Sequence, residues 1–287
     1  MSDFLIHLAA LSLGGGAVAL ILMLTARFTH ARYAARWRCW VWLVLCLRLA
    51  VPLPLLPDRP AQQAPIQLPV VEDRVVLRPA QPAASSSAPV EPEAGAAPAL
   101  SLSQLIFGLW LLGAAVVLIW NLLSHLRFCR YLNRWAAPVR DADILALYNA
   151  LGNQLGLDRR PRLLSCPGLA VPMLAGLFRP ALLLPENPPA GDALRFSLLH
   201  ELTHFRRRDI FRKTLALWVR ALHWFNPLVW LTARTMDRDI ELSCDESALK
   251  HLPPAEHAAY GRTILSAVSA LTGAGRPQSA SISDSEI

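Results

Sequence analysis

The longest uncharged apolar stretch of the chain is LSLSQLIFGLWLLGAAVVLIWNLL, residues 100–123. A helix of this length rises about 36 Å, which is enough to cross a hydrocarbon core of about 30 Å. A second long stretch, residues 4–26, has His7 as its only ionisable residue. The sequence therefore predicts a chain held in a membrane by helices. The N-terminal helix is expected to be a retained anchor, because no charged leader precedes it and no small-residue cleavage site follows it.

A third apolar stretch, residues 39–57, carries Arg48 and ends in prolines, so it is a weak span on its own. Beside the first stretch, it is expected to complete a hairpin. The Pro-, Ala- and Ser-rich segment that follows cannot bury a core and is expected to be a linker. The predicted division is a transmembrane hairpin (1–57), an extracytoplasmic linker (58–99), a third transmembrane helix (100–124), a cytoplasmic metallopeptidase domain (125–270) and a polar tail (271–287).

Basic residues mark one side of these spans. The connection between the first two spans and the segment after the third are rich in arginine, namely Arg27, Arg32, Arg36 and Arg38, then Arg127, Arg130, Arg134 and Arg140. By the positive-inside rule both segments are cytoplasmic and the N-terminus is outside. The net charge of +7 is therefore attributed to membrane orientation, and no direct contact with nucleic acid is expected.

The expected cytoplasmic part alternates helical and strand patterns. Residues 141–157 have helical periodicity and end at a glycine, and residues 162–186 indicate two or three short strands. A helix that carries two histidines follows, with Asp192 placed to cap its N-terminus. These patterns predict an α+β domain in which the strands precede the site.

Residues 210–233 are long and apolar but hold four basic side chains, Arg212, Lys213, Arg220 and His223. At 100° per residue the four fall within an arc of roughly 100°. A central arginine costs about 2.5–3.5 kcal/mol on insertion scales, so we expect an amphipathic helix on the membrane or across the domain, not a span. The basic stretch FRRRDIFRK, residues 205–213, lies beside this helix and is expected to meet anionic lipid headgroups.

The stretch SLLHELTHFRRRD, residues 197–209, places Glu201 between His200 and His204. One helical turn separates the two histidines, so both imidazoles can reach one Zn²⁺ ion. Glu201 points to one side of the ligand positions, where it can accept a proton from the attacking water and pass it to the leaving amine. The pattern predicts a hydrolytic zinc site with Glu201 as general base.

Such a site needs a third protein ligand. The helical stretch DRDIELSCDESALK puts Glu241 and Asp245 one turn apart, and Glu241 is the expected ligand because its long side chain can reach a neighbouring helix. Asp245 can then accept the free N–H of a ligand histidine. Asp209 has two open roles, pairing with nearby arginines or supporting the same histidines. Cys244 is expected to be a small buried side chain, and His223 a residue of the polar helix face.

Several stretches together resemble the M56 family of integral-membrane zinc peptidases, whose BlaR/MecR-type receptors sense β-lactam antibiotics. They are FRPALLLPE, LLHELTHFRRRD, HWFNPLVW, ELSCDESALK and YGRTIL. The resemblance implies a zincin-type (gluzincin) α+β cytoplasmic domain on an α-helical membrane anchor. It also implies His200, His204 and Glu241 as ligands of one zinc ion and Glu201 as base.

The resemblance further implies a bacterial inner-membrane regulator that cuts itself and a transcriptional repressor on the cytoplasmic side when an external signal arrives. FRPALLLPE would be the edge strand along which substrate lies extended. The receptors continue into another span and a penicillin-binding sensor, whereas this sequence finishes with a polar GAGRPQSASISDSEI. We therefore expect either a truncated form or a member whose input comes from elsewhere, and β-lactam sensing is not expected from these residues.

The combined hypothesis is a membrane-bound zinc endopeptidase that hydrolyses a regulatory protein in signal transduction. One alternative is an M48-like membrane quality-control protease, which shares the ligand pattern but not HWFNPLVW. Another is a non-catalytic signalling scaffold in which zinc is structural or absent. The substrate, the inducing signal and the oligomeric state stay open.

Overall fold

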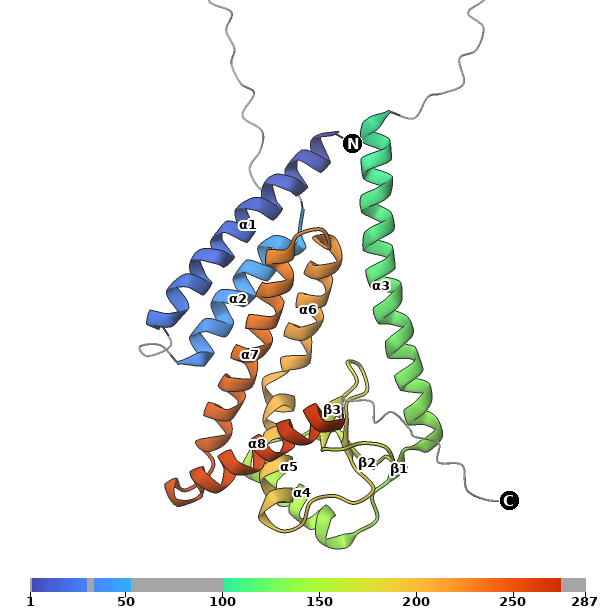
Figure 1. Cartoon of the computed structure of the whole chain (residues 1–287). Helices are drawn as coiled ribbons and strands as arrows, with labels where there is room; N and C mark the ends of the chain where they lie inside the picture. Colours follow the sequence, from blue (N-terminus) through green and yellow to red (C-terminus); the bar gives the residue numbers. More distant parts are fainter. Residues whose placement is uncertain (1, 30–33, 53–100, 275–287) are drawn as a thin grey trace, which may run out of the picture.

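The structure, a computed structural model, describes residues 2–29, 34–52 and 101–274. A bundle of long helices forms its upper part in Figure 1, and a small sheet surrounded by shorter helices forms its lower part. The predicted linker (58–99) lies outside the described residues, as do residues 275–287 of the predicted tail.

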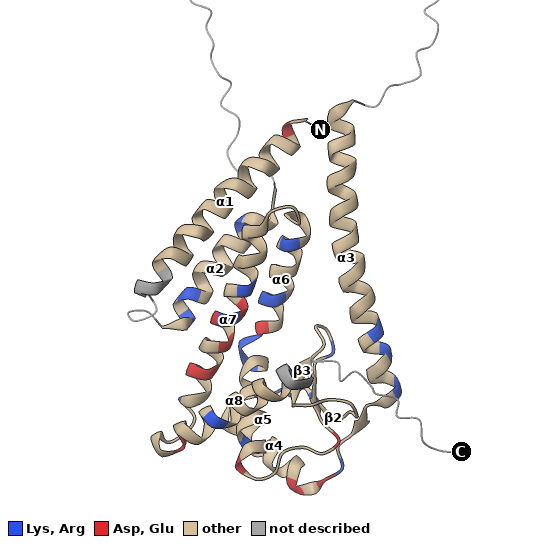
Figure 2. Cartoon of the chain, in the orientation of Figure 1, with Lys and Arg blue, Asp and Glu red and all other residues tan. Residues whose placement is uncertain are grey.

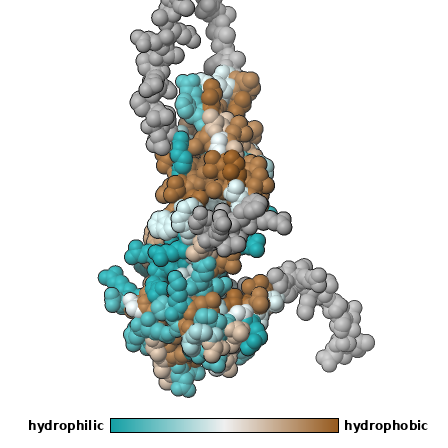
Figure 3. Space-filling model, turned by 90° about the vertical axis from the view of Figure 1, so that its left-hand side faces the viewer, coloured by the Kyte–Doolittle hydropathy of each residue, from teal (hydrophilic) through white to brown (hydrophobic). Residues whose placement is uncertain are grey.

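Two helices of the bundle are long and apolar enough to cross a membrane, α1 (Ser2–Thr29) and α3 (Leu102–Trp135). Very little of the apolar part of α3 is buried within the chain, unlike the core helix of a soluble protein. The third outer helix, α2 (Ala35–Ala50), begins earlier than the predicted apolar stretch and stops before its prolines. Figure 3 shows apolar residues across the bundle and mostly hydrophilic residues below it, and Figure 2 shows almost no charges on α1 or on the upper part of α3.

The prediction of one amphipathic helix over residues 210–233 is wrong. The segment is divided between α6 (Asp209–Leu222) and α7 (Pro227–Leu249), which stand together as a hairpin beside α2 in Figure 1. Asn226 causes the break, because its side chain accepts a hydrogen bond from the Leu228 amide at 2.9 Å and caps a new helix that starts with proline. The hairpin therefore belongs to the bundle and does not lie on a membrane surface as one helix.

The turn between α6 and α7 is tied to all three outer helices. Asn226 donates to the carbonyl of Ser12 in α1 at 3.0 Å, and Trp224 donates to a carbonyl of α3 at 3.1 Å. Nε2 of His223 lies 3.1 Å from the Leu49 carbonyl of α2. His223 is completely buried, so its predicted place on a polar helix face is wrong.

The lower part contains a four-stranded sheet in the order β1-β2-β4-β3. Its strands are β1 (Ala137–Pro138), β2 (Arg162–Ser165), β3 (Met173–Ala175) and β4 (Ala181–Leu184). β2 and β4 are parallel, and the other two pairs are antiparallel. Three strands lie within the predicted region, and β1 was not predicted.

FRPALLLPE was predicted to be an edge strand, and this is wrong, because it contains β4, which is an inner strand. β3 folds back against β4 through a turn of residues 176–180, in which Gly176 has a φ of +90°. The edge strands of the described sheet are therefore β1 and β3, and β3 is the uppermost strand in Figure 1.

The two faces of the sheet pack against different helices. Leu182 and Leu184 face a core formed with α4 (Ala142–Gln154), α5 (Asp192–Arg207) and α8 (His257–Ala274). Leu183, on the opposite face, packs with Phe128 and Leu132 of α3. The sheet thus joins the lower end of α3 to the helix that carries the histidines.

The N-terminus of α5 differs from the prediction. Gly191, with a φ of +58°, is the N-cap residue, and no side chain caps the helix. Asp192 occupies the first turn, where its carboxylate lies 3.4 Å from Arg195 and suits the positive end of the helix dipole. Asp192 therefore stabilises the start of α5 by charge and not by capping.

Candidate metal centre

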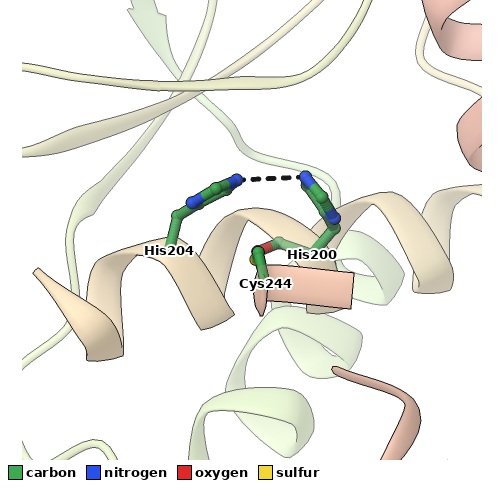
Figure 4. Close-up of side chains that lie close together, drawn as sticks. All are labelled: His200, His204 and Cys244. Carbon is green, nitrogen blue, oxygen red and sulfur yellow. Dashed lines mark hydrogen bonds between the residues drawn. The ribbon is translucent and has the colours of Figure 1, made fainter. Parts of the chain in front are cut away.

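α5 presents two histidines on one buried face. His200 and His204 are each 8% exposed, and their Nε2 atoms lie 3.1 Å apart with the rings nearly perpendicular. Figure 4 shows these two nitrogens pointing toward one another above the helix. The predicted spacing thus brings two potential ligand atoms to one point.

Glu241 of α7 reaches the same point from a neighbouring helix. Its Oε2 lies 3.1 Å from Nε2 of His204 and 3.5 Å from Nε2 of His200. Ligand atoms about 2.1 Å from a tetrahedral Zn²⁺ ion are separated by about 3.4 Å. The three atoms are therefore already spaced for one zinc ion, to within a few tenths of an ångström.

Cys244, one turn further along α7, is a second candidate for the third position. Its Sγ and the two imidazoles lie within 4.8 Å of one another, a wider spacing than that of the Glu241 group. Cys244 is fully buried, and its thiol donates to the carbonyl of His200 at 3.5 Å. Figure 4 shows it below the imidazoles, beside the helix, so it packs as the predicted small buried side chain.

Each histidine has a carboxylate at its other ring nitrogen. Nδ1 of His204 lies 2.9 Å from Oδ2 of Asp209, and Nδ1 of His200 lies 3.1 Å from Oδ1 of Asp245. A carboxylate at Nδ1 keeps the proton there and leaves the Nε2 lone pair free for a metal. The structure brings both predicted supporting residues to the imidazoles.

Asp209 has both of the roles left open by the sequence. Besides His204, it accepts hydrogen bonds from Arg207 at 2.9 Å and Arg212 at 2.7 Å, and it is 1% exposed. Arg208, with a φ of +56°, makes the sharp joint between α5 and α6 that allows these contacts. The expectation that this basic stretch meets lipid headgroups is therefore wrong for Arg207 and Arg212, which bond internally.

Two further residues contact the group and were not predicted to do so. The hydroxyl of Tyr260 in α8 lies 2.9 Å from Nδ1 of His200 and donates to Asp245 at 2.8 Å. Lys213 Nζ lies 2.9 Å from Oε1 of Glu241, the oxygen that does not face the histidines. YGRTIL is one of the stretches that resemble the M56 family, but the distance along the chain from its tyrosine to the histidines does not predict a contact between them.

Glu201 lies between the histidines and the edge strand. Its Oε2 accepts a hydrogen bond of 2.7 Å from the backbone N–H of Leu174 in β3. Burial raises the pKa of Glu201, and the nearby histidines offset part of that rise. A buried carboxyl group with a raised pKa is suited to accept and return a proton.

The carboxylates also control the protonation of the two imidazoles. Burial acts to lower the pKa of His200, but hydrogen bonds with Asp245 and Glu241 outweigh it and raise the pKa to about 10. For His204 burial is again outweighed, chiefly by Asp209, and the pKa rises to about 12. The carboxylates therefore favour the protonated imidazoles in the metal-free chain, and a metal ion that binds at Nε2 must compete with protons there.

The model of the BlaR1 peptidase M56 family matches residues 6–285, nearly the whole chain. The chain belongs to this family. Membership in a peptidase family agrees with the predicted enzyme class, and the two long apolar helices agree with a membrane protein.

Curated relatives of this M56 peptidase are regulatory and resistance proteins. The chain is 30% identical over 166 residues to the regulatory protein BlaR1 of Bacillus licheniformis, an alignment of 57% of this chain and 28% of the relative. It is 33% identical over 97 residues to the methicillin resistance mecR1 protein of Staphylococcus aureus, or 33% of this chain and 17% of the relative. The chain thus aligns with less than a third of the length of either relative.

Proposed function

We propose that this chain is a zinc-dependent membrane endopeptidase of the zincin type that cleaves a regulatory protein. The observation that carries the proposal is the convergence of the His200, His204 and Glu241 ligand atoms at 3.1–3.5 Å, with Glu201 beside them. The donor set, two imidazoles and one carboxylate, is typical of catalytic zinc sites and leaves a position open. His200, His204 and Glu241 would hold the ion, and Asp245 and Asp209 would orient the imidazoles.

Zinc bound there would polarise the scissile carbonyl and acidify a water molecule. Glu201 lies beside the three ligand atoms but is not itself a ligand. It can therefore take the proton of the attacking water and return it to the leaving amine. Its contact with the Leu174 N–H holds the carboxylate at the edge of β3. Substrate would then lie extended along β3, where backbone hydrogen bonds can bind chains of different sequence.

The predicted membrane arrangement is part of the proposal. α1, α2 and α3 would cross a bacterial inner membrane with the N-terminus outside, and the exposed arginines Arg127, Arg130 and Arg134 would mark the cytoplasmic side. The substrate would be a transcriptional repressor, and the chain would also cleave itself. The names of the relatives, a regulatory protein and a resistance protein, support a signalling role over a quality-control one.

The test is to replace Glu201 by glutamine in the full chain in lipid nanodiscs. We expect zinc content to stay at about one ion per chain, while cleavage of the chain itself and of fluorescein-labelled casein falls by at least about 10²-fold. Glu186→Gln, a change of the same kind at an exposed residue, should behave as wild type. Full cleavage by the Glu201→Gln chain, with contaminating proteases excluded, would refute the proposed role.

The third ligand and the scaffold alternative are tested together. Glu241→Ala should lose most of the zinc, whereas Cys244→Ala should retain it, because only the carboxylate oxygen has zinc-ligand spacing. The opposite result would point to a site formed by the histidines and the thiol. Stoichiometric zinc with no hydrolysis of any offered repressor would favour the non-catalytic scaffold.

A further inference from the structure

The turn between β3 and β4 carries an unusual apolar side chain. Phe178 is 91% exposed, the highest value among the exposed large hydrophobic side chains of the described residues. The next most exposed, such as Leu13, Leu102 and Trp120 at 71–73%, lie on α1 and α3, the two helices suited to cross a membrane. Phe178 thus has the exposure of a lipid-facing residue but lies on a loop.

The position of this turn places Phe178 near the end of the apolar part of α3. Ala175 and Ala181, which flank the turn, pack in one cluster with Phe128 of α3. The uncharged stretch of α3 ends at Leu123. Phe128 follows five residues later, which is about 7–8 Å further along the helix. In Figure 1, β3 is the uppermost strand, and the loop beside it rises toward the bundle.

The charges around the turn suit a lipid–water boundary. Arg179, next to Phe178, is exposed, and Arg127 and Arg130 are exposed on the adjacent part of α3. An aromatic ring flanked by cations is a combination that binds at anionic membrane surfaces, with the ring below the headgroups and the cations among the phosphates. A purely aqueous position would leave the most exposed large apolar side chain unexplained.

We propose that the turn between β3 and β4 enters the lipid–water interface, with Phe178 reaching the acyl chains and Arg179 at the headgroup phosphates. This inference rests on the part of the proposed function that places α3 across a bilayer. It adds a membrane contact made by the sheet to those made by the helices. Because the same hairpin contains Leu174, which holds Glu201, the bilayer surface would fix the edge strand beside the site.

The test uses the photoreactive amino acid p-benzoylphenylalanine in the full chain, in nanodiscs of phosphatidylcholine and phosphatidylglycerol. It is placed at Phe178, at Trp120 as a lipid-facing control on α3, and at exposed Asp158, between α4 and β2, as a control away from the bundle. After irradiation, mass spectrometry identifies the adducts. Phospholipid adducts are expected at positions 178 and 120 and at most a few per cent of them at 158.

The outcomes separate this inference from the proposal on which it rests. Lipid adducts at 120 but not at 178 would overturn the interfacial turn alone, and protein adducts at 178 would assign Phe178 to a protein contact. No lipid adduct at either position would overturn the membrane placement of α3. As a second measurement, Phe178→Asp should increase hydrogen exchange at residues 173–184 in nanodiscs more than in detergent, whereas Phe178→Leu should not.

Discussion

Replacing Tyr260 by phenylalanine isolates one contact of the candidate metal centre. The change removes the hydroxyl that lies 2.9 Å from His200 and 2.8 Å from Asp245. It keeps the ring, which packs edge-on against Phe196 with centroids 5.9 Å apart. The packing of α8 on α5 should therefore survive, while one support of a candidate ligand imidazole is lost.

The size of the effect follows from what remains. Asp245 stays 3.1 Å from Nδ1 of His200, so the imidazole keeps its carboxylate and its tautomer. Loss of a whole supporting partner of a zinc ligand weakens metal binding about 10–100-fold. Because Asp245 remains after the Tyr260 hydroxyl is removed, we expect the lower end of this range. Zinc affinity should fall about tenfold, or about 1.4 kcal/mol.

The assay is zinc affinity by chelator competition, together with the spectrum of the cobalt-substituted chain and the thermal unfolding of the metal-free chain. Tyr148→Phe is the matched control, because Tyr148 is also buried and its hydroxyl also donates, to a backbone carbonyl away from the histidines. Both changes should cost about 1 kcal/mol of stability, but only Tyr260→Phe should change the affinity and the cobalt spectrum. Equal zinc affinity in the two variants would refute the positioning role of Tyr260.

Three other features give predictions of the same kind. Arg38→Met leaves the carboxylate of Asp239 buried without its partner at 2.9 Å and should destabilise the chain by about 3–5 kcal/mol in thermal unfolding. Arg38→Met with Asp239→Asn removes the unpaired charge but keeps an oxygen that accepts from Trp42, so it should recover part of the loss. Gly176→Ala should weaken the hairpin by about 1–2 kcal/mol, because its φ of +90° is unfavourable for a side chain, and faster hydrogen exchange in β3 would show it. Because the pKa values of His200 and His204 are raised to about 10 and about 12 in the metal-free chain, zinc binding at pH 7 should release protons and strengthen as the pH rises. Calorimetric heats that do not vary with the ionisation enthalpy of the buffer would contradict this last prediction.

The parts of the site that sequence predicted are local in the chain. His200 and His204 share a helical turn, as do Glu241 and Asp245, and helix geometry alone fixes which of these side chains share a face. Tyr260 and the Leu174 amide could not be predicted in this way, because their contacts depend on how α8 and β3 pack against α5. Asn226-Pro227 is a sequence signal for the start of a new helix, and it indicates the break before α7. The long apolar stretch around it favoured a single helix instead.

Arg38 shows that a count of charges does not predict contacts. It was assigned to a cytoplasmic connection on the basis of its charge, yet its side chain is buried against Asp239, which also accepts a hydrogen bond of 2.7 Å from Trp42. The positive-inside rule counts arginines near the ends of membrane spans whatever their partners in the folded chain, so it carries no information about such a contact. Arg38 links α2 to α7 two residues before Glu241, a connection between an outer helix and a candidate metal ligand that composition could not reveal.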